Sequence, residues 1–266
     1  MRDGPAVLAL DFDGVLCDGR PEYFEAARRA YAAAWPAPRA AERAGVAARF
    51  AALRPLIESG WEMPVLYHAL AADVPQAAMM DRGAWLATAR RLLGEAGVDA
   101  ETLGRALNAV RDEWFARDPA GWLAHHAFYP GVVARLDSLL AGPARVVVVT
   151  TKAERFVRAL LAAQRPALAR LPIIGREPGR AVPKVESLRR LVAEHGLSAG
   201  GAGLWFVEDM LETLQSVRRA PDLDGARLFL AAWGYNTLED RAVTGGCSRM
   251  AVLSLAGFAG DWTAWG

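Results

Sequence analysis

The sequence has few of the side chains that build disulfides or zinc sites, with two cysteines and four histidines in 266 residues. Cys17 and Cys247 are too few for a disulfide framework, which favours a protein of the reducing cytoplasm. Cys17 is most simply read as a small buried thiol. The adjacent pair His125-His126 lacks the spacing of metal ligands, so we expect no zinc site.

The chain also lacks a long apolar segment and an excess of charge of one sign. Its N-terminus has no apolar stretch typical of a signal peptide or a membrane span. The 31 Lys and Arg residues nearly balance the 30 Asp and Glu residues, and 53% of the chain is hydrophobic. We therefore expect a cytoplasmic globular protein with a substantial core, and neither nucleic acid nor a membrane as a partner.

Two regions of different pattern divide the chain. Residues 21–126 are rich in Ala, Leu and Arg with helical periodicity and no convincing strand. Their expected helices are 22–31, 40–53, 63–72, 84–96 and 100–115. We expect Trp85, Trp114 and Trp122 to pack in the core of this helical region, as large aromatic side chains usually do.

After Tyr129-Pro130-Gly131, helical segments alternate with short apolar runs. This pattern is typical of βαβ units, which form a parallel sheet covered by helices. The expected strands are 6–10, 145–149, 171–174, 204–207 and 227–231. We thus predict an α/β fold with a Rossmann-like sheet domain, residues 1–20 and 127–266, interrupted after its first strand by an all-helical insertion, residues 21–126.

The first strand runs into Asp11-Phe12-Asp13-Gly14. Successive side chains of a strand point to opposite faces, so Asp11 and Asp13 can share a site only if the chain turns between them, and Gly14 permits such a turn. Ligands of open α/β sheets bind at the carboxyl ends of strands, where these acids lie. Alone, the motif is equally well read as two solvated acids in a turn.

Polar residues follow other apolar runs in the same way. Thr150-Thr151-Lys152 follows one run, Glu208-Asp209 follows another, and Lys184 opens a helix between them. Each has a simpler reading on its own: Thr150 as a helix cap, Lys184 as a solvated lysine, the acids as helix N-terminal charges. Their occurrence together at strand ends favours a site.

Gly200, Gly201 and Gly203 precede a strand, so we read them as a turn and not as a dinucleotide loop.

In this order, the four motifs resemble those of the haloacid dehalogenase superfamily of phosphohydrolases. Tyr129-Pro130-Gly131-Val132 and Trp233-Gly234-Tyr235 are similar to those of phosphoglycolate-phosphatase-like members with a helical cap. Residues 206–209, 213–214 and 233–237 resemble a poorly characterised group of cyanobacterial and plant members. The resemblance implies the same fold, with the helical insertion as cap.

The resemblance also implies roles for individual residues. Asp11 is the expected nucleophile, which forms an aspartyl-phosphate, and Asp13 the expected acid and base for the leaving oxygen and the water. Thr150 and Lys184 are expected to bind the phosphoryl group, Lys184 also holding the nucleophile. Gly14 and Thr151 are further candidates for substrate binding.

Charge alone requires a cation at this site. Asp11, Asp13, Glu208 and Asp209 bring up to four negative charges together, and a phosphate monoester adds about two more. We predict Mg²⁺ on Asp11, Asp209 and the backbone carbonyl of Asp13. The fourth motif departs from the usual acid spacing, so either Glu208 or Glu212 is expected to complete the metal shell through water.

Recognition of the rest of the substrate is expected in the helical insertion. Residues 54–63 mix Arg54, two Glu and a Trp around a glycine, as a polar lining does, although a helix–helix turn with solvated charges explains them as well.

The segment 261–265 could bind a partner, but covering an apolar part of its own domain is the favoured reading.

The sequence as a whole favours a Mg²⁺-dependent phosphatase acting on a small phosphorylated metabolite. A sugar-phosphate mutase keeps the same motifs and is the nearest enzymatic alternative. A weakly active binding or regulatory protein is the alternative from another class, because the fourth motif is altered. The substrate and the oligomeric state are left open.

Overall fold

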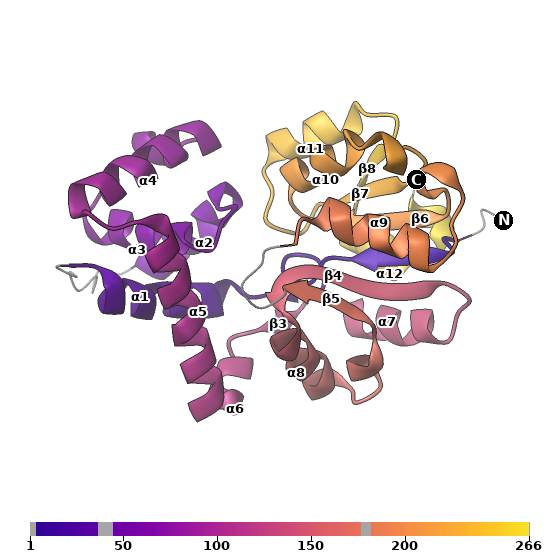
Figure 1. Ribbon diagram of the computed structural model, residues 1–266, viewed down its shortest axis with the longest axis horizontal. Helices are drawn as coiled ribbons and strands as arrows, with labels where there is room; N and C mark the ends of the chain where they lie inside the picture. Colours follow the sequence, from indigo (N-terminus) through magenta and orange to yellow (C-terminus); the bar gives the residue numbers. More distant parts are fainter. Residues whose placement is uncertain (1–3, 37–44, 177–181, 266) are drawn as a thin grey trace. The chain divides into compact units, whose positions relative to one another are not determined.

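The computed structural model describes residues 4–36, 45–176 and 182–265 (Figure 1). The chain divides into two compact units, one of Met1–Asp18 with Ala127–Gly266 and the other of Gly19–His126. Within the described residues, no helix is both long and apolar enough to cross a lipid bilayer. The two units are described in turn.

A six-stranded parallel sheet forms the centre of the first unit, in the order β5-β4-β1-β6-β7-β8. The short β1 is buried along its whole length, because it lies between two neighbours and under helices on both faces. The strands are β1 (Val7–Leu10), β4 (Arg145–Ala153), β5 (Ile173–Arg176), β6 (Leu204–Glu208), β7 (Arg227–Ala231) and β8 (Met250–Leu253). The prediction of an α/β fold with a parallel sheet is confirmed.

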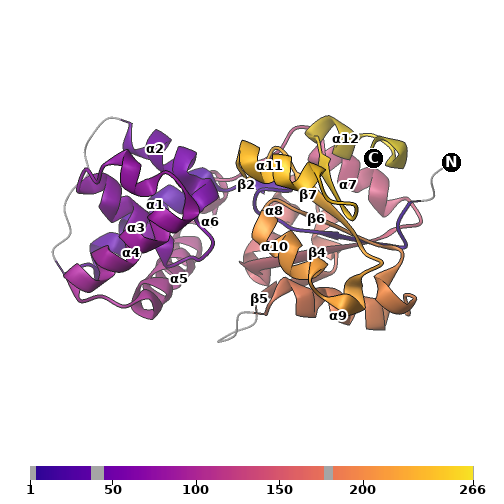
Figure 2. The ribbon, with the colours of Figure 1, turned by 90° about the horizontal axis from the view of Figure 1, so that it is seen from above.

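Helices cover both faces of this sheet (Figures 1 and 2). One face packs on α9 and α10, whose Leu188, Leu191, Leu214 and Val217 join Val7 of β1 in one buried cluster. The opposite face carries α7 and α8. The helices of the unit are α7 (Val132–Leu140), α8 (Glu154–Gln164), α9 (Lys184–Glu194), α10 (Leu211–Arg218), α11 (Leu238–Gly245) and α12 (Leu255–Ala259).

The sheet differs from its prediction at three places. The last strand, β8, was not predicted, because its four residues at the edge of the sheet are buried, half-buried, exposed and buried in turn, which is neither a buried run nor an alternation. The run expected at 171–174 forms a strand two residues later, as Ile173–Arg176, and β4 extends to Ala153. The glycines at 200, 201 and 203 lie in a turn before β6, as expected, and all three have a positive φ.

The C-terminal segment packs on its own domain. Trp265, in the short helix Trp262–Trp265, is 1% exposed. Its ring lies 5.7 Å from that of Trp205, 5.2 Å from that of Phe229 and 5.5 Å from that of Phe258, measured between centroids. Burial of the terminal tryptophan confirms that the segment covers an apolar part of this unit.

The second unit is entirely helical in its described residues. Its helices are α1 (Arg20–Ala34), α2 (Val46–Leu53), α3 (Glu62–Ala71), α4 (Arg82–Ala96), α5 (Ala100–Arg117) and the unpredicted short α6 (Pro119–Leu123). The first residues of the helix expected at 40–53 lie outside the described part. Trp85, Trp114 and Trp122 are all buried, which confirms their assignment to the core. Two antiparallel strands, β2 (Cys17–Asp18) and β3 (Ala127–Phe128), form the ends of the first unit from which this insertion departs.

Candidate active site

The order of the strands singles out the carboxyl ends of β1 and β6. From β1 the chain continues outward to β4 and β5, then returns across the sheet to β6 and proceeds the other way to β7 and β8. The order therefore reverses between β1 and β6, which is where ligands bind in open α/β sheets. Asp11 directly follows β1, Glu208 ends β6, and Asp209 comes next.

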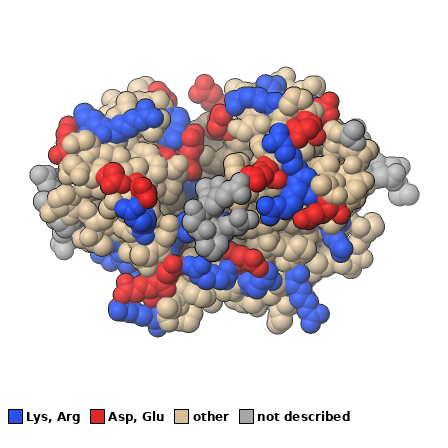
Figure 3. Space-filling model, viewed as in Figure 1, with Lys and Arg blue, Asp and Glu red and all other residues tan. Residues whose placement is uncertain are grey.

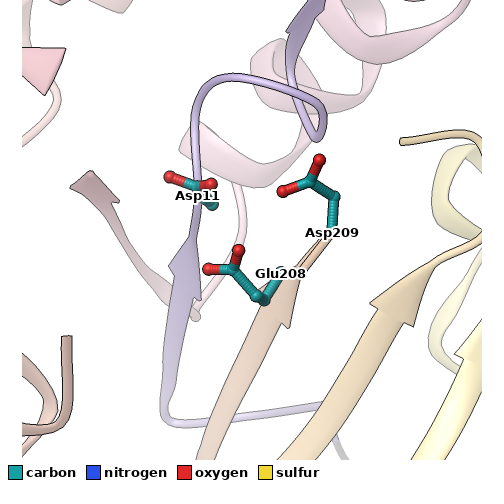
Figure 4. Close-up of side chains that lie close together, drawn as sticks. All are labelled: Asp11, Glu208 and Asp209. Atoms are coloured by element: carbon teal, nitrogen blue, oxygen red, sulfur yellow. The ribbon is translucent and has the colours of Figure 1, made fainter. Parts of the chain in front are cut away.

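These three acids form one buried cluster (Figure 4). An oxygen from each of Asp11, Glu208 and Asp209 lies within 4.8 Å of the other two. The three residues are 5%, 0% and 1% exposed. Buried carboxylates at such separations are stable in their ionised form only with compensating positive charge.

Lys184 supplies part of that charge. It is the first residue of α9, and its Nζ lies 2.8 Å from Asp11 Oδ2 and 2.5 Å from Glu208 Oε2. The other oxygen of Glu208, Oε1, accepts a hydrogen bond of 3.1 Å from the amide of Met210. Glu208 is thus held at both oxygens and fixes the ammonium group beside Asp11.

Burial and mutual repulsion shift the acid–base properties of this cluster. Burial, and then the charge of Glu208, raises the pKa of Asp11 to about 7. Burial is also the main cause that raises the pKa of Glu208 to about 7, with a further contribution from Asp209. Burial opposes the charge of Lys184, but Asp11 and Glu208 outweigh it and raise the pKa of that ammonium above its ordinary value. One lysine therefore leaves the carboxylates short of positive charge.

Asp209 is held by residues of the loop after β7. The amide of Tyr235 donates to Asp209 Oδ2 at 2.8 Å, and Asn236 Nδ2 donates to the carbonyl of Asp209 at 3.0 Å. Gly14 packs on the same carboxylate and has a φ of +83°, as expected for the turn that follows Asp13. These contacts orient Asp209 toward Asp11.

Asp13 forms an ion pair with a second lysine, Lys152. Lys152 Nζ is 3.1 Å from Asp13 Oδ1 and 3.3 Å from Oδ2. This lysine follows Thr150 by two positions on β4, so both side chains point to the same side of the strand. The amide of Lys152 donates to Thr150 Oγ1 at 3.2 Å, which leaves the hydroxyl proton of buried Thr150 available for another acceptor. Thr151 is exposed on the opposite side, and its part in substrate binding stays a prediction.

The acidic cluster fits a divalent cation. Carboxylate oxygens are the ligands that hard cations such as Mg²⁺ and Ca²⁺ prefer. Four carboxylates, those of Asp11, Asp13, Glu208 and Asp209, face two ammonium groups, which leaves two negative charges when all are ionised. Of the two acids considered for the outer shell, Glu208 lies in the cluster, whereas Glu212 is half exposed and pairs with Arg219 at 3.2 Å.

Residues 54–63 mainly support the fold of the helical unit. Glu62 is fully buried, forms an ion pair with Arg82, and accepts a hydrogen bond of 2.7 Å from Trp85 Nε1. Arg54 donates to the carbonyl of Ile57 at 2.7 Å, and its guanidinium lies 5.1 Å from the ring centroid of Tyr23. Neither the polar lining nor a turn with solvated charges describes Glu62, because its carboxylate is buried in an ion pair within the helical unit. Substrate binding by Arg54 stays a prediction.

The thiol of Cys17 and the distribution of surface charge were also predicted from the sequence. Cys17 is fully buried, and burial raises the pKa of its thiol, as expected of an inert cysteine. On the face shown in Figure 3, acidic and basic side chains are interspersed. This face has no large surface of a single sign.

Sequence reasoning named no role for Lys152 or Asn236. Lys152 stands two residues after Thr150, and the alternation of β4 was a signal that it shares the site. Tyr235 and Asn236 were noted only as part of a family-like segment. Their contacts depend on where the loop after β7 meets β6, which no local pattern reveals.

Comparisons with known proteins agree with this architecture. A family model described as haloacid dehalogenase-like hydrolase matches residues 5–220. A crystal structure named a predicted phosphatase from Clostridium acetobutylicum has a TM-score of 0.61 at 14% identity, with 97% of each chain covered.

Two other solved structures share the fold. A predicted phosphoglycolate phosphatase from Haemophilus somnus has a TM-score of 0.57 at 17% identity, with 89% of each chain covered. Protein tyrosine kinase A of Mycobacterium tuberculosis has a TM-score of 0.56 at 19% identity, over 98% of this chain and 96% of that one. Among curated proteins, no relative matches. At such identities the structural likeness extends to the fold alone.

Proposed function

Because the chain belongs to the haloacid dehalogenase-like hydrolase family, we propose that it is a Mg²⁺-dependent phosphatase acting on a small phosphorylated metabolite through an aspartyl-phosphate on Asp11. One observation carries this proposal. A buried carboxylate, Asp11, has one oxygen held by Lys184 at 2.8 Å and lies beside two further acids at the carboxyl ends of β1 and β6. The arrangement is suited to a nucleophile that receives a charged group.

In the first step, Asp11 attacks the phosphorus of the substrate. Lys184 holds Oδ2, so Oδ1 is the oxygen that forms the new bond to phosphorus. The bond from phosphorus to the leaving oxygen breaks, and that oxygen takes a proton from Asp13. The hydroxyl of Thr150, which accepts from the amide of Lys152, donates its proton to a phosphoryl oxygen. Lys184 offsets the charge of both the nucleophile and the phosphate.

In the second step, water hydrolyses the aspartyl-phosphate. Asp13, now a carboxylate, takes a proton from the water while the water oxygen bonds to phosphorus. The bond between Asp11 and phosphorus breaks, which releases inorganic phosphate and restores both acids. Asp13 thereby ends the cycle protonated, as it began.

Mg²⁺ is the cation we assign to the acidic cluster, held by Asp11, Asp209 and the backbone carbonyl of Asp13. Bound there, it neutralises charge on the carboxylates and on the transferring phosphoryl group. The remaining acid, Glu208, has both oxygens engaged by Lys184 and Met210, so we assign it to the outer shell. The free thiols Cys17 and Cys247 suit a reducing compartment, and we place the reaction in the cytoplasm.

Recognition of the substrate beyond its phosphate is assigned to the helical unit, with Arg54 as the candidate residue. The four motifs handle the phosphoryl group alone and leave the rest of the molecule to other residues. If this is right, Arg54→Ala raises KM for the physiological substrate and leaves kcat unchanged.

The test is a phosphate-release screen over a panel of phosphorylated metabolites, with Mg²⁺ and with EDTA. Wild type should release phosphate from at least one member only when Mg²⁺ is present, and Asp11→Asn should release none while keeping the thermal unfolding of a folded protein. Isomerised product in place of free phosphate would indicate a mutase. Phosphate release by Asp11→Asn at the wild-type rate would exclude the proposal.

A further inference from the structure

Lysine is almost absent from this chain, and both of its lysines lie on the aspartates of the Asp11-Phe12-Asp13 motif. The sequence has 29 arginines and two lysines. Lys184 Nζ lies 2.8 Å from Asp11 Oδ2, and Lys152 Nζ lies 3.1 Å from Asp13 Oδ1. The chain thus uses lysine only where an ammonium group meets one of these two carboxylates.

At other positions of the described part of the chain, arginine forms ion pairs. An example in the same unit is Arg189, whose guanidinium binds Asp222 through both nitrogens Nε and Nη2. A guanidinium is wide, planar and forked, whereas an ammonium is a compact point charge that accommodates other groups around its partner. An ion pair that only supported the fold at position 152 would be served by arginine, as such pairs are at many other positions of this chain.

The surroundings of Lys152 explain the need for a compact group. Its side chain is 7% exposed, and that of Asp13 is 17% exposed. The ladder between β4 and β5 shifts register between Val149 and Ala153, which is the stretch that contains both Thr150 and Lys152. Such an irregularity turns side chains out of the regular ladder and is common beside active sites.

Lys152 contacts two groups of the proposed reaction at once. Its ammonium group pairs with the carboxylate of Asp13, and its backbone amide donates a hydrogen bond to the hydroxyl oxygen of Thr150. Lys152 therefore links the carboxylate of Asp13 to the hydroxyl that is expected to bind the phosphoryl group. A shift of about one ångström in a group that moves a proton lowers the rate strongly.

We propose that Lys152 is a positioning residue that holds the carboxylate of Asp13 where it takes the proton of the hydrolytic water. This inference rests on the proposed function and deepens it. The bonds that change are those of the second step: the water oxygen bonds to phosphorus, its proton goes to Asp13, and the bond from phosphorus to Asp11 breaks. Lys152 itself gains and loses no proton.

The test uses p-nitrophenyl phosphate with Lys152→Met. The leaving nitrophenolate needs no proton, so formation of the aspartyl-phosphate continues, whereas its hydrolysis slows. We expect a burst of nitrophenolate equal to the number of active sites, then a steady rate about 10-fold or more below that of wild type, with kcat/KM within about 2-fold of wild type.

Matched variants make the result specific. Arg189→Met removes an exposed cation from the same unit and should give neither a burst nor a lower kcat. Lys152→Arg keeps the charge but widens the group. It should therefore still show the burst followed by the lowered steady rate. Partly unfolded protein would lower the burst amplitude but not the ratio of burst rate to steady rate, so a folding defect does not imitate the expected result.

Each outcome decides the inference. Loss of kcat and kcat/KM in parallel, a raised KM with normal kcat, or full recovery by Lys152→Arg would overturn it. If wild type releases phosphate normally but Lys152→Met shows no burst, the positioning role fails and the phosphatase stands. If wild type releases no phosphate from any substrate, both fail together.

Discussion

Gly14 packs directly against the carboxylate of Asp209. A Cβ added to Gly14 would lie 2.0 Å from Asp209 Oδ2, and the φ of +83° is one that side chains other than glycine rarely adopt. The turn after the first motif and the orientation of the last acid are therefore two parts of one arrangement. The first and last motifs meet here, although they are almost 200 residues apart in the chain.

Gly14→Ala tests this packing. We expect the substitution to displace the carboxylate of Asp209 and to weaken Mg²⁺ binding about 10-fold or more, in addition to about 1–3 kcal/mol of backbone strain. Gly196→Ala is the matched control, because Gly196 also has a positive φ, of +58°, but nothing lies within 4 Å of the added Cβ. Calorimetric Mg²⁺ titration of both variants measures the difference. Equal loss of affinity would mean that strain, and not the contact with Asp209, is responsible.

A second prediction concerns the ion pair of Lys184 and Glu208. In metal-free protein, Lys184→Met leaves buried carboxylates without their shared cation, at a cost of about 3–5 kcal/mol in the free energy of unfolding. The double variant Lys184→Met/Glu208→Gln removes both charges and should recover part of that loss, giving a coupling energy of about 1 kcal/mol or more. Urea unfolding in EDTA of wild type, the two single variants and the double variant measures this coupling energy. Additive effects of the two substitutions would show that the 2.5 Å contact adds no coupling.

The raised pKa values predict how stability varies with pH. Asp11 and Glu208 have pKa values of about 7, above their ordinary values of 3.8 and 4.5. Because the folded protein holds these protons more tightly than the unfolded chain, the stability they contribute is complete below about pH 4 and is lost as the pH rises through about 7. The free energy of unfolding of metal-free protein should therefore fall over this range.

Mg²⁺ should oppose this fall, because it binds the ionised acids. We expect added Mg²⁺ to raise Tm more at about pH 8 than at about pH 5.5, since at the lower pH the cation must displace protons. Thermal unfolding with Mg²⁺ or EDTA at both pH values gives the comparison. Asp11→Asn, which has one fewer acid to titrate, should show a smaller difference. An equal shift at both pH values in wild type would contradict the assignment of the cation to these acids.

The aromatic cluster at the C-terminus gives a prediction about stability. Trp265 is 1% exposed among Trp205, Phe229 and Phe258, so Trp265→Ala should lower the free energy of unfolding by about 3–5 kcal/mol. Thr263 lies in the same segment and is exposed, and Thr263→Ala should cost about 1 kcal/mol or less. Denaturant unfolding distinguishes the two. Unchanged stability of Trp265→Ala would mean that the segment does not hold this unit together.

Sequence patterns predicted the parts of the site that local structure determines. The apolar run before Asp11 is a buried strand, the chain turns at Gly14, and Lys184 begins a helix. In a parallel sheet, the carboxyl ends of neighbouring strands meet at one edge, so polar residues in those positions converge without further information. The sequence therefore predicts the grouping of Asp11, Glu208 and Asp209.

The remaining features depend on long-range packing. The pair of Lys152 and Asp13 joins positions 139 residues apart, and the two residues meet because β1 pairs with β4. Glu62 reads as a polar lining residue in sequence, yet it is buried against Arg82 and Trp85 of α4, because the two helices pack together. The edge strand β8 is too short and too exposed for its pattern to identify it.

Asp11 as the phosphoryl acceptor is tested most directly by mass spectrometry of acid-quenched protein. Asp13→Asn, in which hydrolysis of the intermediate is slowed, is mixed with p-nitrophenyl phosphate and Mg²⁺ and digested with pepsin. We predict that the peptide containing Asp11 gains the mass of one phosphoryl group, that hydroxylamine removes it, and that Asp11→Asn/Asp13→Asn lacks it. Release of phosphate by wild type with the label on another peptide, or on none, would contradict Asp11 as the nucleophile.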